Sequence, residues 1–257
     1  ACGVLNGAAP FLRDGVELVC EEFLKHGKVI ELGPFRVTSW LVDHSAFDAY
    51  CFLIEAEGER IFYSGDLRGH GRKSSLFEAM VLRDWGDVDL MLLEGTTVGR
   101  GPEVVYKSES ELEDDFAREF GATEGLALVC TSSQNIDRIV TVFRAAKRAG
   151  RKLIIDVYCN EVLKATGYGT VPNADWDDVF VFVPFRQRVW IRRQKLFECV
   201  KSVKASRVYP EELEALAGRS VMLFREMMCS DLERAGCLAG ALGIYTLRSV
   251  DERGPRW

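Results

Sequence analysis

The sequence predicts an α/β protein with a mixed or antiparallel sheet followed by a parallel sheet. Residues 51–56 and 60–63 are rich in strand-forming side chains, and Glu57-Gly58-Glu59 joins them as a turn typical of a hairpin. Residues 126–130 and 152–157 are apolar strands that flank a segment of helical period. Such a β-α-β unit implies parallel strands. Because the two patterns differ, we expect two domains, residues 1–98 and 99–257.

Length and composition support this organisation. A chain of 257 residues can form two domains that each have a core. A hydrophobic content of 47% with 28% charged residues is typical of a globular protein. The formal charge of −6 argues against a globally cationic nucleic-acid binder, but it leaves local basic patches open.

Other features exclude several kinds of protein. The eight cysteines form no C-x-x-C pair, which favours buried, reduced thiols in a cytoplasmic protein over a zinc knuckle. There is no apolar run of about 18 residues and no signal-peptide pattern, so we expect no membrane span. The chain also lacks G-x-G-x-x-G, which argues against dinucleotide binding.

Several segments outside the hairpin have clear patterns. Apolar spacing over residues 16–24 predicts a helix that ends near His26-Gly27, where His26 would cap it. The apolar run 88–93 predicts a buried parallel strand. Residues 131–134 resemble a capping box for the following helix, and Gly150 stops that helix. Further strands are expected at residues 29–30, 35–42, 179–183, 221–224 and 242–246, and further helices at 74–82, 109–120, 211–216 and 231–235.

Three polar residues follow predicted strands in the first half of the chain. His44 comes after residues 35–42, Asp66 ends the second hairpin strand in Ser-Gly-Asp, and Glu94 follows an apolar run. Histidine and carboxylate side chains at neighbouring strand ends can share a metal ion. Structural alternatives exist for each: a hydrogen-bonded histidine at a strand end, a capping aspartate, and a glutamate bonded to the amides of residues 96–97. Asp43 could support His44 as a second carboxylate supports a ligating imidazole.

The run VDHSAFDAYCFLIEAEGERIFYSGDLRGHGRK, followed by DLMLLEGTT and an α/β unit, resembles a metallo-β-lactamase-fold hydrolase of the RNA-processing β-CASP branch. The resemblance extends over about residues 28–247. It implies a partial metallo-β-lactamase sandwich plus a β-CASP-like domain. It also implies zinc ligation by His44 and Asp66, catalytic roles for Asp66 and Glu94, and RNA as the substrate of a two-metal hydrolysis.

One departure from that family bears on function. Such hydrolases carry an upstream His-x-His-x-Asp-His run, whereas this chain has three histidines and no such run. A pair of zinc ions needs more ligands than His44 and Asp66 supply. We therefore expect a segment or shortened relative of such a hydrolase, with the zinc site partial or absent. The alternative is a non-catalytic α/β module that binds RNA or self-associates, and a homo-oligomer would cover the incomplete sandwich.

Two segments are candidates for contacting RNA. The loop of residues 67–73 places cations among glycines, which lets its backbone approach a phosphate. The amino end of the helix after residue 135 offers hydroxyls and backbone amides to a phosphate. A solvated loop and ordinary helix capping explain the same residues. The candidate substrate-binding residues are Arg68, His70, Arg72, Lys73, Ser132, Ser133, Asn135 and Arg138.

The most basic stretch of the chain is residues 186–195, which contain Trp190 and precede Phe197. Aromatic side chains among arginines suit single-stranded RNA. The alternative is a helix face whose long side chains pack along the domain.

Overall fold

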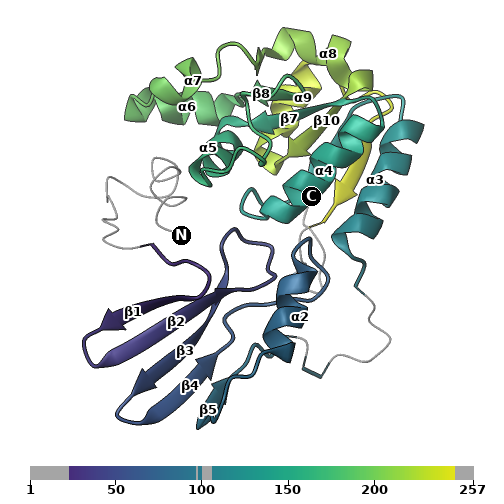
Figure 1. The fold of residues 1–257 in the computed structure, drawn as a ribbon. Helices are drawn as coiled ribbons and strands as arrows, with labels where there is room; N and C mark the ends of the chain where they lie inside the picture. The colour runs from purple at the N-terminus through teal and green to yellow at the C-terminus, as the bar shows by residue number, and fades with distance from the viewer. Residues whose placement is uncertain (1–22, 97, 100–105, 247–257) are drawn as a thin grey trace. The chain divides into compact units, whose positions relative to one another are not determined.

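A computed structural model describes residues 23–96, 98–99 and 106–246 of the chain (Figure 1). Contacts divide the described residues into two compact units, 23–111 and 112–246. The first contains a mixed five-stranded sheet and the second a six-stranded parallel sheet. The predicted α/β fold class is therefore confirmed. The division near residue 98 into a metallo-β-lactamase-like and a β-CASP-like domain stays a prediction.

The sheet of the first unit follows chain order. Its neighbours are antiparallel from β1 to β4, and β5 is parallel to β4. Glu57 and Gly58 have φ angles of 53° and 89°, as a two-residue hairpin turn requires. The predicted hairpin is thus confirmed. The elements are β1 (Lys28–Leu32), β2 (Phe35–Leu41), β3 (Tyr50–Ala56), β4 (Glu59–Tyr63), α2 (Ser74–Leu82) and β5 (Leu90–Leu92).

A small aromatic core holds α2 against one face of this sheet. Val42, Cys51 and Phe62 are buried, and Met80 of α2 packs against them. Burial raises the pKa of the Cys51 thiol to about 11. The thiol is therefore protonated at neutral pH. Its burial agrees with the prediction of buried cysteine thiols.

The strand β5 corrects one prediction. It is parallel to its neighbour β4 as expected, but it is not buried. Leu90, Met91, Leu92 and Leu93 are between 48% and 62% exposed. The strand β5 lies at the edge of the sheet and pairs within the described ranges only with β4. No other described element covers its apolar side chains well enough to bury them.

The helix end predicted near His26 is also wrong. Residues 23–25 are not helical, and His26-Gly27 forms a turn that leads into β1. The Nδ1 atom of His26 accepts a hydrogen bond from the backbone N–H of Leu41 at 3.2 Å. His26 thus joins the start of one strand to the end of the next. Residues 16–22 of the predicted helix lie outside the described residues.

The second unit is built on a parallel sheet in the order β11-β6-β10-β7-β8-β9. Its strands are β6 (Ala127–Cys130), β7 (Lys152–Asp156), β8 (Val179–Phe182), β9 (Arg207–Val208), β10 (Ser220–Phe224) and β11 (Leu242–Tyr245). Its α-helices are α3 (Glu109–Ala122, whose first turn belongs to the first unit), α4 (Ile136–Arg148), α5 (Val157–Ala165), α6 (Phe185–Gln194), α7 (Glu198–Lys201), α8 (Leu213–Leu216) and α9 (Cys229–Arg234). Short 3-10 helices cover Pro210–Glu212, Ala217–Arg219 and Glu226–Met228.

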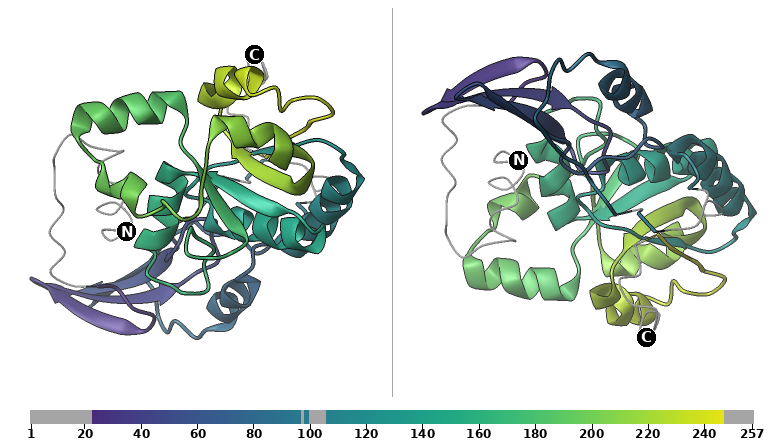
Figure 2. Two further views of the ribbon diagram at one scale, coloured as in Figure 1. Left: turned by 90° about the horizontal axis from the view of Figure 1, so that it is seen from above. Right: turned by 90° about the horizontal axis from the view of Figure 1, so that it is seen from below.

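Helices cover both faces of this parallel sheet (Figures 1 and 2). On one face, Ile154 of β7 and Met222 of β10 pack with Leu213 of α8 and Leu232 of α9. On the other face, α4 contacts β7 and β10 and buries its apolar side. A parallel sheet covered on both faces has strands that are apolar throughout, which explains the uninterrupted apolar runs in the sequence.

The structure places the cap of α4 later than the sequence predicts. The Oδ1 atom of Asn135 accepts a hydrogen bond from the backbone N–H of Arg138 at 3.0 Å, so Asn135 is the N-cap. The expected capping box at residues 131–134 is instead the connection from β6. Asparagine is at least as good a cap as serine or threonine, which is why the helix begins beside it. The predicted stop at Gly150 is confirmed by its φ of +68°.

Candidate functional site

The polar residues predicted after the strands of the first unit gather at one edge of its sheet. The register pairs Leu41 with Tyr50, Phe52 with Tyr63, and Tyr63 with Leu92. The carboxyl ends of β2, β4 and β5 therefore lie side by side at the same end of the sheet, which we call the shared edge. His44, Asp66 and Glu94 each follow one of these ends. The shared edge on which the site hypothesis depends is present.

Hydrogen bonds connect the segments after β4 and β5. The carboxylate Oε2 of Glu94 accepts a bond from the backbone N–H of Leu67 at 2.5 Å. The backbone N–H of Glu94 donates to the hydroxyl of Ser64 at 2.9 Å. Glu94 is thus hydrogen-bonded to Ser64 and Leu67, the residues that flank Gly65-Asp66. The alternative bond to the amides of residues 96–97 involves residue 97, which lies outside the described residues.

The glycine of Ser-Gly-Asp is required by its conformation and its surroundings. Gly65 has a φ of +59°, in the left-handed region. A Cβ atom at this position would lie 2.5 Å from the carbonyl oxygen of Tyr50. The sharp turn that leads to Asp66 therefore depends on the absence of a side chain.

His44 is placed at the edge but is not oriented as a ligating histidine usually is. Its Nδ1 atom accepts a hydrogen bond from the backbone N–H of Ala46 at 3.2 Å. In the neutral ring, the proton is then on Nε2, so that atom presents no lone pair. Ligating histidines commonly donate one ring N–H to an acceptor and bind metal through the other nitrogen.

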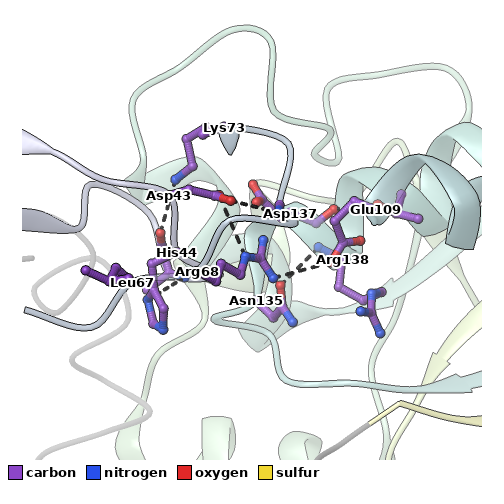
Figure 3. Close-up of polar contacts among 12 residues, drawn as sticks. Asp43, His44, Leu67, Arg68, Lys73, Glu109, Asn135, Asp137 and Arg138 are labelled. Atoms are coloured by element: carbon purple, nitrogen blue, oxygen red, sulfur yellow. Dashed lines mark hydrogen bonds and ion pairs between the residues drawn. The ribbon is translucent and has the colours of Figure 1, made fainter. Parts of the chain in front are cut away.

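Asp43 does not support His44, contrary to expectation. It is fully buried, and its Oδ2 accepts a bond from the backbone N–H of Gly71 at 2.7 Å. Its Oδ1 lies 3.7 Å from Nε of Arg68, and Arg68 also pairs with Glu109 at 3.5 Å (Figure 3). Asp43 therefore anchors the basic loop of residues 67–73.

Part of the positive charge of this loop is paired with carboxylates of the first unit. Arg68 is largely enclosed by its two carboxylate partners. The ring of His70 stacks on Tyr106 with 5.4 Å between centroids, and Lys73 donates to the carbonyl of Ala46 at 3.4 Å. Arg68 therefore has a structural function, whereas phosphate binding by His70, Arg72 and Lys73 stays a prediction.

The described residues do not fit a complete two-zinc centre. In the ranges 23–96, 98–99 and 106–246, no three His, Cys, Asp or Glu side chains come together to hold a metal. Asp66 is exposed and forms no hydrogen bond or ion pair with another described residue. The roles of His44 and Asp66 as ligands remain a prediction.

At the amino end of α4, three of the predicted phosphate-binding residues already form hydrogen bonds within the second unit. Asn135 caps the helix, and the buried hydroxyl of Ser133 bonds to the guanidinium of Arg225. Ser132 is exposed and accepts a bond from the N–H of Gln134 at 3.2 Å. Phosphate binding by Ser132 and Arg138 stays a prediction.

Sequence reasoning missed an ion pair between a buried carboxylate and a half-buried guanidinium in the second unit. Asp156 ends β7, Arg225 follows β10, and the two side chains form a salt bridge. The other carboxylate oxygen of Asp156 accepts a bond from the backbone N–H of Cys159 at 2.6 Å and so caps α5. The signal was available, since each residue directly follows a run of apolar residues, as Glu94 does.

This pair has clear electrostatic consequences. Burial by itself lowers the pKa of Arg225, but the charge and hydrogen bond of Asp156 offset it and raise the pKa above its usual value. Burial raises the pKa of the neighbouring Cys159 thiol to about 12. The guanidinium is therefore a permanent cation, and the thiol stays neutral.

Comparisons with curated proteins find similarity to ribonuclease J. Ribonuclease J of Sinorhizobium meliloti is 26% identical over 155 residues, which is 60% of this chain and 27% of that protein. Ribonuclease J of Mycobacterium tuberculosis is 28% identical over 138 residues, 51% of this chain and 24% of that protein. The chain is similar to ribonuclease J. The matched segment is about a quarter of the length of these curated relatives.

The fold has a relative among solved structures. A protein of unknown function from Enterococcus faecalis V583 superimposes with a TM-score of 0.66 over 95% of this chain and 62% of that one, at 15% identity. No family model matches the chain. Within the described residues, no helix is both long and apolar enough to cross a membrane.

Proposed function

We propose that this chain is a ribonuclease J-like RNA-processing module that binds single-stranded RNA and contributes part of a metal site. The observation that carries the proposal is the sheet edge at which β2, β4 and β5 end together, with Glu94 hydrogen-bonded beside Asp66. Similarity to ribonuclease J supports RNA as the substrate class.

We expect the proposed metal site to be incomplete in this chain. His44 and Asp66 are its expected ligands, and two ligands are fewer than a zinc ion needs from a protein. We therefore expect RNA binding by the chain, and we expect hydrolysis only when further donor groups complete the site. Metal binding and RNA binding are separate measurements, so each part of the proposal is tested independently.

The test combines two measurements on the same protein. We expect fluorescence anisotropy to show binding of a labelled single-stranded RNA that weakens with added salt. Replacing Arg72 and Lys73 together by alanine should weaken binding about tenfold and reduce the slope of log K against log salt by about 1 to 2. Elemental analysis after incubation with zinc should give fewer than two ions per chain.

The control and the contradicting outcomes are specific. Arg36→Ala removes an exposed cation of β2 that pairs with Glu31 at 3.9 Å, and it should leave RNA binding unchanged. No RNA binding at low salt would overturn the function. Two tightly bound zinc ions per chain, lost in Asp66→Asn, would overturn the incomplete site in favour of a full hydrolase centre.

A second candidate function, self-association, rests on the exposed edge strand β5. Apolar, unpaired edge strands favour pairing with another chain. We expect sedimentation velocity to show concentration-dependent dimers. Leu92→Lys should abolish them, because charge on an edge strand opposes pairing. Leu82→Lys, at an exposed site on α2, is the matched control. A monomer at all concentrations would exclude this candidate.

A further inference from the structure

A pocket of about 320 Å³ lies at the carboxyl edge of the parallel sheet in the second unit. Its lining residues come from the segments after β7, β8 and β10, which are neighbours in the sheet. Ligands of open α/β sheets bind at this edge. The volume falls at the lower end of small-molecule sites. The lining residues are Tyr158, Arg186, Gln187, Trp190, Arg225 and Met227.

Tyr158 and Arg225 line the pocket and contact each other. The guanidinium of Arg225 lies 5.3 Å from the ring centroid of Tyr158. The guanidinium donates hydrogen bonds to Asp156 and Ser133, which fix its position. Fixed aromatic rings and a planar guanidinium are the surfaces on which nucleobases stack in single-stranded RNA recognition.

A buried amide in the pocket lacks a partner. Gln187 is 7% exposed, and its Oε1 atom forms no hydrogen bond with any described residue. Buried polar atoms are nearly always paired, and an unpaired one costs about 1–3 kcal/mol. Rotation of the terminal amide toward the pocket would let the N–H donors at the edge of a nucleobase satisfy this oxygen.

The positive charge of Arg186, at the rim of the pocket, could pair with an anion. Arg186 is exposed and makes no hydrogen bond or ion pair with another residue in the described part of the chain. The charge of Arg225 is balanced by Asp156, whose exposed fraction is 1%. Arg186 therefore supplies the positive charge of the pocket, in a form suited to a phosphate.

We propose that this pocket binds one nucleoside monophosphate unit. The base stacks beside Tyr158 and Trp190, its edge donates to the amide of Gln187, and its phosphate pairs with Arg186. The unit is either a free nucleotide or one nucleotide of a single-stranded RNA. Only the choice of RNA rests on the proposed function, because the pocket contains none of the residues of the candidate metal site.

Calorimetric titration with AMP tests the site in the whole chain. We expect AMP to bind and Arg186→Ala to weaken it about tenfold, the loss of one charge-assisted hydrogen bond. Adenosine, which lacks the phosphate, should bind equally to both proteins. Arg192→Ala removes a cation from the same helix outside the pocket lining, so it should leave AMP binding unchanged.

A second variant separates binding from folding. Gln187→Leu removes the unpaired amide, so it should leave the melting temperature unchanged or higher while it weakens AMP binding several-fold. If Gln187 were only structural, AMP binding would not change. An unchanged affinity in both Arg186→Ala and Gln187→Leu would overturn the proposal, as would the absence of binding by both AMP and RNA.

Competition distinguishes the sources of the nucleotide. If a short single-stranded RNA displaces AMP, the pocket accepts a nucleotide of the RNA. If AMP binds but RNA neither binds nor competes, the pocket stands and the proposed RNA function fails. If RNA binds equally well to Arg186→Ala and Gln187→Leu and AMP does not bind, the pocket fails and the RNA function stands.

Discussion

Asp156→Ala is expected to destabilise the second unit by about 2–4 kcal/mol, because it removes a buried carboxylate that accepts hydrogen bonds from Arg225 and Cys159. Asp156 is buried and balances the charge of the half-buried Arg225, so the variant leaves this cation without a counter-charge. The same change removes the N-cap of α5, which contributes about 1 kcal/mol by itself. Both effects act in the same direction.

Urea denaturation measures this loss, and hydrogen exchange should localise it to β7 and β10. Asp175→Ala is the matched control, since Asp175 is exposed and its ion pair with Lys164 at 2.9 Å is at the surface. That variant should change the free energy of unfolding by less than about 1 kcal/mol. A comparably small effect of Asp156→Ala would contradict the structural importance of the pair.

Replacing both partners of the ion pair provides a further check. In Asp156→Ala combined with Arg225→Met, the half-buried cation is removed together with its partner. The double variant is expected to be more stable than Asp156→Ala alone, because a partly desolvated cation without a partner costs more than an apolar replacement. A double variant that is less stable than the single variant would show that Arg225 stabilises the unit without Asp156.

Gly65→Ala is expected to destabilise the first unit by about 2–4 kcal/mol. A left-handed backbone costs a residue with a side chain about 1–2 kcal/mol. The new Cβ atom would also lie 2.5 Å from the carbonyl oxygen of Tyr50. Tyr50 belongs to β3 and is paired with Leu41, so its backbone cannot move away without breaking the sheet. The displacement should also weaken the hydrogen bond from Leu67 to Glu94.

Gly33→Ala separates the two causes. Gly33 has a φ of +60°, nearly the same as Gly65, but no atom lies within 4 Å of the position its Cβ would take. This variant should lose only about 1 kcal/mol, the conformational part of the effect. Thermal denaturation of both variants measures the difference. Equal losses would mean that the contact with Tyr50 has no energetic consequence.

The candidate site was predictable only in part. His44, Asp66 and Glu94 could be identified because each directly follows a strand pattern, and pairing then places them at one edge. The internal pairing of Arg68 with Asp43 could not be predicted, because it joins segments that are separate in sequence. The same limitation hid the contact between Asp156 and Arg225, although both positions carried the signal used for Glu94.

Local patterns of the chain suffice for the hairpin of β3 and β4, for α2, and for the β-strands around α4, since turn chemistry and apolar period act over a few residues. Long-range pairing decides the rest. The insertion of β10 between β6 and β7, which brings Arg225 to Asp156, is not encoded in any short stretch. The exposure of β5 likewise depends on whether another layer covers it, since an apolar run has the same pattern at a sheet edge and in a core.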